Sequence, residues 1–228
     1  MPTDLPTKLA ALRDQLSGSR CQGEIQRSES SDADATQTMV PLPLNGKPIS
    51  WPERPADHRN AAVLFLLYPA VLEHSELNLV FIQRPEYGGA HGGQISLPGG
   101  RQEPNETLAQ TATRETHEEV GVHPDEVTLI GKLGEFYVPA SNHNVHPFVG
   151  YAPKRPEFVP CEQEVADIIE APLKTLLDPA ARRSEVRNLM RWGDTEVPYF
   201  SVNHHKIWGA TAIMLKEFLA VLGETIDE

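Results

Sequence analysis

Four glutamates and one arginine fall in a short stretch of the 228-residue chain, at spacings that place the first in a loop and the other four on one helix: Glu106, then Arg114, Glu115, Glu118 and Glu119. At 3.6 residues per turn, Glu115 and Glu119 share one side of a helix, and Glu118 lies about 60° from Glu115. Carboxylates this close repel one another unless a cation lies among them. Their oxygens suit Mg²⁺ or Mn²⁺, which also bind phosphate oxygens. The spacing therefore predicts a divalent metal site, with a solvated acidic helix face as the alternative.

A helix over residues 107–120 must position these side chains. Asn105 or Thr107 can cap its start, because both residue types accept hydrogen bonds from the free N–H groups of a first turn. Gly121 follows where a left-handed C-terminal cap is expected. The inward face of this helix begins apolar and ends acidic, so the same face would pack on the domain and carry the carboxylates.

The fixed positions have the spacing of a known signature: Gly100, five residues, Glu106, seven residues, Arg114-Glu115, two residues, Glu118-Glu119, then Gly121. This pattern resembles the Nudix box of the Nudix hydrolases. Thr116 stands where the box usually has an aliphatic residue, at a packing position that leaves the carboxylates unchanged. The resemblance implies an α/β fold, the Nudix α/β/α sandwich with a mixed sheet and a loop-helix-loop catalytic motif.

The resemblance also implies roles for individual residues. Glu115 and Glu119 would bind Mg²⁺ or Mn²⁺, with the Gly100 carbonyl completing the shell. Glu118 would be a further metal ligand or the base, and Arg114 would orient it.

A more distant glutamate belongs to the same expectation. Residues 162–173, expected as a short helix or turn, resemble the segment after the central strands of the family. Glu164 within it is a candidate metal ligand or base, although a surface glutamate is the commoner outcome.

The glycine-rich segment before the box narrows the family. Arg84, Gly93 and Pro98-Gly99-Gly100 match the additional motif of the coenzyme A pyrophosphatase branch, and His91 and Gln94 resemble residues beside it. We therefore expect Arg84, His91 and Gln94 to bind substrate. Two positions depart from the motif: Pro85 replaces a small residue and Gly89 replaces an arginine. The resemblance therefore supports diphosphate chemistry more strongly than coenzyme A specificity.

Composition limits the class of partner and the compartment. The net charge of −12 argues against a nucleic-acid surface, whereas a small phosphorylated ligand held through metal remains compatible. Cys21 and Cys161 are too far apart in sequence to indicate a disulfide framework or a zinc site. Since the sequence has neither an apolar run near 18 residues nor a basic, apolar leader, we expect no membrane partner and a reducing cytoplasm.

The chain divides into two expected parts. Residues 1–59 would form a short helix, a polar linker and an extended arm, which could pack on the domain, close the pocket or support a homodimer. Residues 60–225 would form the Nudix domain. Its expected strands are residues 61–68, 77–83, 127–133, 144–151 and 197–202, with a loop or hairpin at 182–191 and a terminal helix at 207–222. Trp208, in that helix, is expected in the core rather than against a ligand.

The leading hypothesis is a hydrolase that cleaves the diphosphate of a nucleoside diphosphate linked to another group, with coenzyme A or a derivative as substrate. ADP-ribose, NADH or another dinucleotide is the alternative within the same chemistry. A nucleotide-sensing module without catalysis and an isomerase of prenyl diphosphates are the alternatives of other classes. The isomerase needs an additional acid or base pair, and neither cysteine lies in a motif that would supply it.

Overall fold

A computed structural model describes residues 5–18, 24–25, 35–47, 49–70, 76–86 and 92–226. His91 and Gly89 of the predicted substrate motif, Cys21 and most of the predicted polar linker lie outside these ranges. None of the helices within them is long and apolar enough to cross a membrane.

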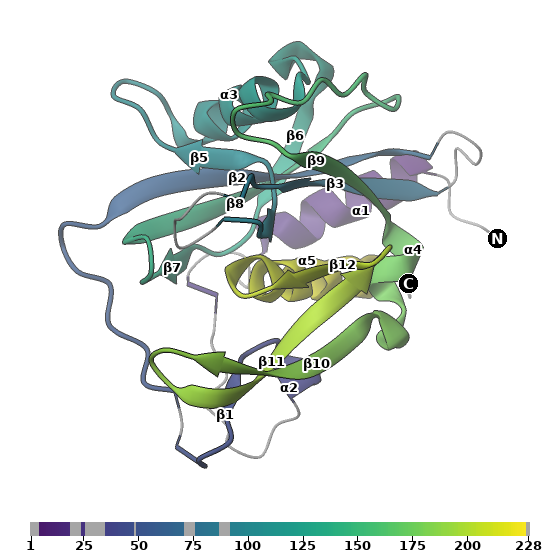
Figure 1. Ribbon diagram of the computed structural model, residues 1–228. Helices are drawn as coiled ribbons and strands as arrows, with labels where there is room; N and C mark the ends of the chain where they lie inside the picture. The colour runs from purple at the N-terminus through teal and green to yellow at the C-terminus, as the bar shows by residue number, and fades with distance from the viewer. Residues whose placement is uncertain are drawn as a thin grey trace.

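An eight-stranded sheet forms the centre of the molecule (Figure 1). Its strands are β2 (Arg59–Pro69), β3 (Leu77–Gln83), β4 (Ile95–Ser96), β5 (Gly99–Arg101), β6 (Thr128–Lys132), β7 (Phe136–Val138), β8 (His143–Tyr151) and β9 (Asp167–Pro172). The path β4-β3-β2-β8-β6 runs through it, with β5 on β2, β7 on β8 and β9 on β3. β2 and β8 pair in parallel and the other pairs are antiparallel, so the sheet is mixed.

Strand β2 has apolar side chains on both of its faces, so helices can pack on both sides of the sheet. Its residues alternate sides, and both sides are buried, which is why its sequence is a continuous apolar run. Leu64 and Leu66 lie in the cluster under α3 (Leu108–Val120). Phe65 and Leu67 lie in the cluster on the opposite face. There the ring of Phe65 stacks on Phe218 of α5 (Ala210–Ile226), with centroids 4.7 Å apart.

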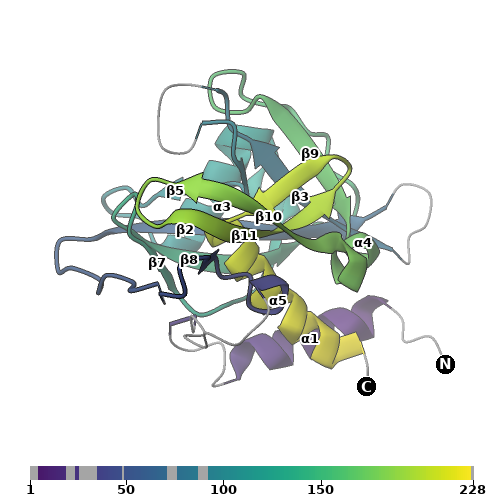
Figure 2. The ribbon, with the colours of Figure 1, turned by 60° about the horizontal axis from the view of Figure 1, so that its bottom comes forward.

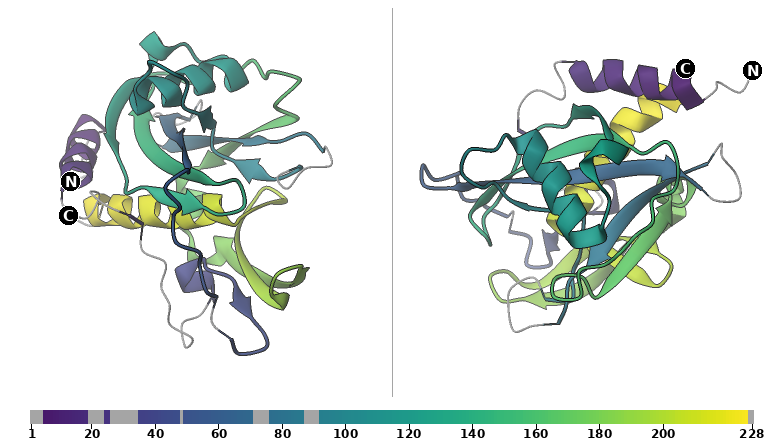
Figure 3. Two further views of the ribbon diagram at one scale, coloured as in Figure 1. Left: turned by 90° about the vertical axis from the view of Figure 1, so that its left-hand side faces the viewer. Right: turned by 90° about the horizontal axis from the view of Figure 1, so that it is seen from above.

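The first helix covers the same face as the last. α1 (Leu5–Ser17) packs against α5 and β6, and its Leu12 and Leu16 are buried. Figure 2 and Figure 3 show α1 and α5 together on the side of the sheet opposite α3. The predicted α/β/α sandwich with a mixed sheet is therefore confirmed, and α1 contributes to one of its helical layers.

A second, smaller sheet lies beyond α5 and is called the small sheet below. Its strands are β1 (Leu42–Pro43), β10 (Arg182–Leu189), β11 (Gly193–Val202) and β12 (His205–Trp208). Short helices α2 (Ala35–Thr38) and α4 (Leu173–Leu177) and two 3-10 turns (Pro124–Glu126 and Pro179–Ala181) complete the fold. β1 comes from the predicted arm and pairs with β11, so this part of the arm is joined to the C-terminal third of the chain.

Two local predictions were wrong and a third is now decided, and strand pairing is the reason in each case. Residues 167–172 form β9 because they pair with β3 and alternate between half-buried and buried positions from Ile168 onward, where we predicted a helix or turn. Of the loop or hairpin predicted at 182–191, the structure forms the hairpin, with residues 182–189 paired to β11. The terminal helix begins at Ala210, because residues 205–208 pair with β11 as strand β12.

The docking of α1 yields a stability prediction. Leu12→Ala leaves a cavity between α1 and α5, and we expect it to lower the free energy of unfolding by about 3 kcal/mol. Leu44→Ala, at a side chain that is 59% exposed, is the control and should change stability by less than about 0.5 kcal/mol. Urea denaturation followed by circular dichroism measures both. Equal midpoints for Leu12→Ala and the parent protein would show that α1 contributes nothing to the folded core.

Candidate active site

Helix α3 carries the acidic site and has defined ends. Thr107 caps it, accepting from the N–H of Gln110, while the Gln110 side chain accepts in return from the N–H of Thr107. Gly121 closes the other end at φ 79° and donates its N–H to the His117 carbonyl. The predicted helix boundaries and cap positions are confirmed. Because both ends of α3 are held by these hydrogen bonds, the side of the helix that faces the sheet is determined as well.

Two glutamates of α3 face strand β5. Glu119 is buried at 3% exposure, and its Oε2 accepts a hydrogen bond from the Gly99 N–H at 2.8 Å. Glu115 lies against Gly100, so closely that a Cβ built on Gly100 would be 2.4 Å from the carboxylate carbon. The glycine pair thus allows both carboxylates to reach the backbone of β5.

Burial changes the acidity of these two groups. It raises the pKa of Glu119 to about 7, against the Gly99 N–H and the charge of Arg84, which lower it. Burial also raises the pKa of Glu115, although Arg114 opposes this effect. The charge of the exposed Glu164 raises both pKa values, and its segment is joined to α3 through the Cys161 N–H, which donates to the Glu119 carbonyl at 3.0 Å. Arg84 and Glu164, distant in sequence, thus both act electrostatically on the acidic site.

Arg114 binds three glutamates at once. Its Nε and Nη2 donate to the two oxygens of Glu106 at 3.0 and 2.9 Å, its Nη1 donates to Glu118 at 2.8 Å, and its Nη2 lies 3.0 Å from Glu115. The bidentate contact with Arg114 lowers the pKa of Glu106 to about 2. Glu118 therefore faces Arg114 and is exposed, while Glu115 and Glu119 face β5. The arginine neutralises much of the repulsion on this helix.

A large cavity meets the acidic site at the glycine pair. It encloses about 780 Å³, and its wall includes Gly99, Gly100, Arg84 and Gln94. None of the described residues that line it is a glutamate of α3, because the carboxylates reach β5 from the opposite side of the sheet. The cavity and the carboxylates thus share the backbone of residues 99–100 as a boundary.

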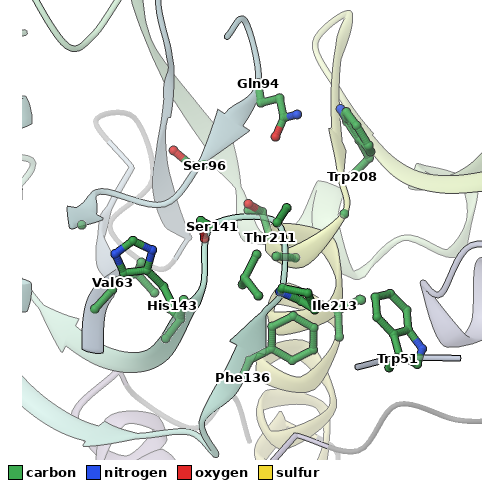
Figure 4. A pocket seen from close by; sticks show the side chains of 18 of the residues that line it. Trp51, Val63, Gln94, Ser96, Phe136, Ser141, His143, Trp208, Thr211 and Ile213 are labelled. Carbon is green, nitrogen blue, oxygen red and sulfur yellow. The ribbon is translucent and has the colours of Figure 1, made fainter. Parts of the chain in front are cut away.

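The far walls of this cavity come from outside the central sheet. All three tryptophans of the chain line it: Trp51 from the arm, Trp192 from the turn between β10 and β11, and Trp208 from β12. Figure 4 shows Trp51, Phe136 and Ile213 at one end, and Gln94, Ser96 and Trp208 at the other. Sequence reasoning missed these walls and placed Trp208 in the core. The available signal was that each tryptophan adjoins a proline or glycine, at an expected turn.

The donor set fits a divalent cation without providing a preformed cage. In the described ranges, no three His, Cys, Asp or Glu side chains gather closely enough to hold an ion by themselves. Glu115 and Glu119 nevertheless present only hard oxygen ligands beside a glycine whose missing side chain leaves the backbone accessible. The side chains of these two residues are therefore compatible with Mg²⁺ or Mn²⁺ held together with backbone and substrate oxygens.

Comparison with known proteins assigns the family. The family model described as NUDIX domain matches residues 58–193. The chain belongs to the Nudix hydrolase family. It is 32% identical over 163 residues to an uncharacterized Nudix hydrolase, NudL, of Yersinia pestis (strain Pestoides F), covering 71% of this chain and 78% of the relative. The same values hold for NudL of Yersinia pseudotuberculosis serotype O:1b (strain IP 31758).

The chain is also similar to solved structures. The MutT/nudix family protein from Enterococcus faecalis has a TM-score of 0.49 and 15% sequence identity, covering 79% of this chain and 66% of that chain. The family match confirms the predicted Nudix fold and enzyme class: the chain is a Nudix hydrolase that acts on nucleoside diphosphates linked to another group. Divalent cations are the general cofactors of this family.

The glycine pair gives a prediction with a built-in contrast. In Gly100→Ala the new methyl displaces the Glu115 carboxylate, a flexible group, so we expect a folded protein with diphosphate hydrolysis reduced on the order of 100-fold. In Gly99→Ala the methyl would lie 2.3 Å from the Ala62 carbonyl oxygen at φ 151°, so this variant should lose stability instead. Steady-state kinetics and thermal unfolding separate the two effects. If Gly100→Ala were fully active, the position of the Glu115 carboxylate would not be required for hydrolysis.

The Glu106–Arg114 contact predicts a pH dependence of stability. The folded pKa of Glu106, about 2, lies below the ordinary value of 4.5, so its contribution is complete above about pH 4.5 and is lost as the pH falls towards 2. Glu106→Gln should therefore cost about 2 kcal/mol at pH 7 and roughly half of that or less at pH 3. Urea denaturation at both pH values tests this, with the exposed Glu103→Gln as control. A cost that stays constant with pH would rule out the charge as its origin.

Proposed function

We propose that this Nudix hydrolase cleaves the diphosphate of coenzyme A or one of its derivatives, with Mg²⁺ or Mn²⁺ as cofactor. The observation that carries the proposal is the cavity of about 780 Å³ that meets the acidic site at Gly99 and Gly100. Arg84 lines the cavity, and its positive charge also lowers the pKa of Glu119. The same guanidinium therefore influences both the cavity and the acidic site. The apolar walls suit a substrate with a long, mostly uncharged group beyond its diphosphate.

The family motif and the geometry together support a division of roles. We assign Glu115, Glu119 and the Gly100 carbonyl to the metal. When bound, the metal would neutralise diphosphate oxygens and lower the pKa of a bound water. Glu164, whose charge acts on both carboxylates, or Glu118 would accept the proton of the attacking water. Arg114 positions Glu118 and Glu115 through its ion pairs, as we predicted for Glu118.

The reaction forms one bond from water to phosphorus and breaks one phosphoanhydride bond. The water proton passes to a carboxylate, and each product carries one of the two phosphates. From coenzyme A the products would be 3',5'-bisphosphorylated adenosine and phosphopantetheine. We assign Arg84 and Gln94, both on the cavity wall, to substrate binding. His91 stays a candidate from the sequence. The homodimer, the absence of nucleic-acid binding, the cytoplasmic location and the division at residues 59 and 60 also stay predictions.

Product analysis tests the substrate. Purified protein with Mg²⁺ or Mn²⁺ should cleave coenzyme A faster than ADP-ribose, NADH or diadenosine polyphosphates. Glu119→Gln should lower the rate by on the order of 100-fold or more, because it replaces a carboxylate assigned to the metal with a neutral amide. Glu103→Gln, outside the signature positions, should retain full activity.

The other outcomes are also informative. Faster cleavage of another compound would keep the hydrolase and replace coenzyme A as substrate. Tight ligand binding without cleavage of any compound, at either metal, would favour the nucleotide-sensing alternative. Removal of metal with EDTA should abolish turnover, and activity that survives chelation would contradict the assigned cofactor.

A further inference from the structure

Trp208 occupies a position that the family signature does not explain. It ends strand β12, beyond the segment that matches the family model, and it is partly exposed on the cavity wall. The guanidinium carbon of Arg187 lies 4.6 Å from the centroid of its ring. Arginine over an aromatic face is favourable through the charge distribution of the ring. The indole is therefore supported by a cation while it lines the cavity.

Arg187 is itself fixed by an ion pair. Its Nε donates to Glu185 Oε1 at 2.7 Å, and its Nη2 lies 2.5 Å from the same oxygen. The other oxygen of Glu185 accepts from Lys206, so the carboxylate is held from two strands. Glu185, Arg187 and Trp208 thus form a connected support, here called the indole platform. Such a support reduces the rotamer entropy that would be lost when a ligand orders Trp208.

Polar groups lie at the same end of the cavity. Gln94 and Ser96 line the cavity, and Figure 4 draws Gln94 between Ser96 and Trp208; strand β4, which contains Ser96, packs against β12. The Ser96 hydroxyl is buried and has no hydrogen-bond partner within the described part of the chain. A hydroxyl and an amide side chain can donate to and accept from the edge of a heterocycle. An aliphatic occupant would leave the Ser96 hydroxyl unsatisfied, which is unfavourable.

We infer that the indole platform stacks on the nucleobase of the substrate, with Gln94 and Ser96 hydrogen-bonding to the base edge. This inference rests on the proposed function, because it places the nucleoside end of a diphosphate substrate. Ser96 and Gly99 are three residues apart, so the chain between them spans at most about 10 Å. That reach is comparable to a nucleoside 5'-phosphate with its phosphate at the glycine pair. The apolar end of the cavity, near Trp51 and Phe136, is then left for the group beyond the diphosphate.

Fluorescence tests the platform without turnover. In the double variant Trp51→Phe/Trp192→Phe, Trp208 is the sole tryptophan. AMP should quench its emission saturably, whereas ribose 5-phosphate, which has the same phosphate and sugar but no base, should not. The same titration with GMP, CMP and UMP then ranks the four bases by their affinity for the site. Absence of quenching by all four nucleotides, or equal quenching by ribose 5-phosphate, would overturn the inference.

Substitutions at the platform provide a second measurement. Trp208→Leu should weaken AMP binding at least fivefold by calorimetry, since stacking of one base on an aromatic side chain has about this effect or more. Trp208→Phe should stay within about threefold of the parent protein, because it retains a flat ring. Trp192→Phe is the matched control on the same cavity and should not change AMP affinity. If Trp208→Leu does not fold, the fluorescence titration and the Trp208→Phe comparison still decide.

The two proposals fail in different ways. AMP binding that depends on Trp208, with no diphosphate hydrolysis, would keep the platform and remove the enzymatic proposal. Hydrolysis of coenzyme A with the same KM in Trp208→Leu, and unchanged AMP affinity, would keep the hydrolase and remove the platform. A rise in KM without a matching fall in kcat is the result expected if the base stacks on Trp208 in the substrate complex.

Discussion

The arrangement of Arg114 among Glu106, Glu115 and Glu118 is the interaction on which the acidic site depends. Without a guanidinium between them, carboxylates on adjacent turns would destabilise the helix that carries them. Glu106 holds the arginine from outside α3, so the loop before the helix and the acidic end of the helix are tied together. Glu115 and Glu119 can then face β5 as a pair rather than as part of a larger cluster of negative charges.

The glycine pair of β5 is the second constraint, because two unrelated parts of the molecule meet there. Carboxylates approach it from the α3 side, and the cavity approaches it from the α5 side. Any side chain at Gly100 would overlap the Glu115 carboxylate, so the boundary between cavity and carboxylates has only the thickness of a backbone. A phosphorylated ligand in the cavity can therefore come close to acidic groups that do not line the cavity themselves.

Local signals in the sequence predicted what is local in the structure. The ends of α3, the two-sided burial of β2 and the positions of the glutamates follow from spacing, capping and apolar runs. The walls of the cavity could not be predicted in this way. The apolar residues around Trp208 recur at helical spacing, but Trp208 pairs with Tyr199 of β11, and its segment is therefore a strand. Likewise, Arg114 contacts Glu106 and Glu115 as well as Glu118. These contacts depend on how far the side chains extend, which sequence spacing alone does not show.

The pairing of the first helix with the last has a consequence for synthesis of the protein. α1 leaves the ribosome before any other described element, yet its buried leucines pack against α5, which ends at Ile226. The parallel pair of β2 and β8 also joins residues far apart in sequence, Arg59 opposite His143. Such non-local contacts slow folding, because long loops must close before any of them forms. The nascent chain therefore carries α1 without its α5 partner until α5 has been synthesised, and chaperone demand should be greatest during that interval.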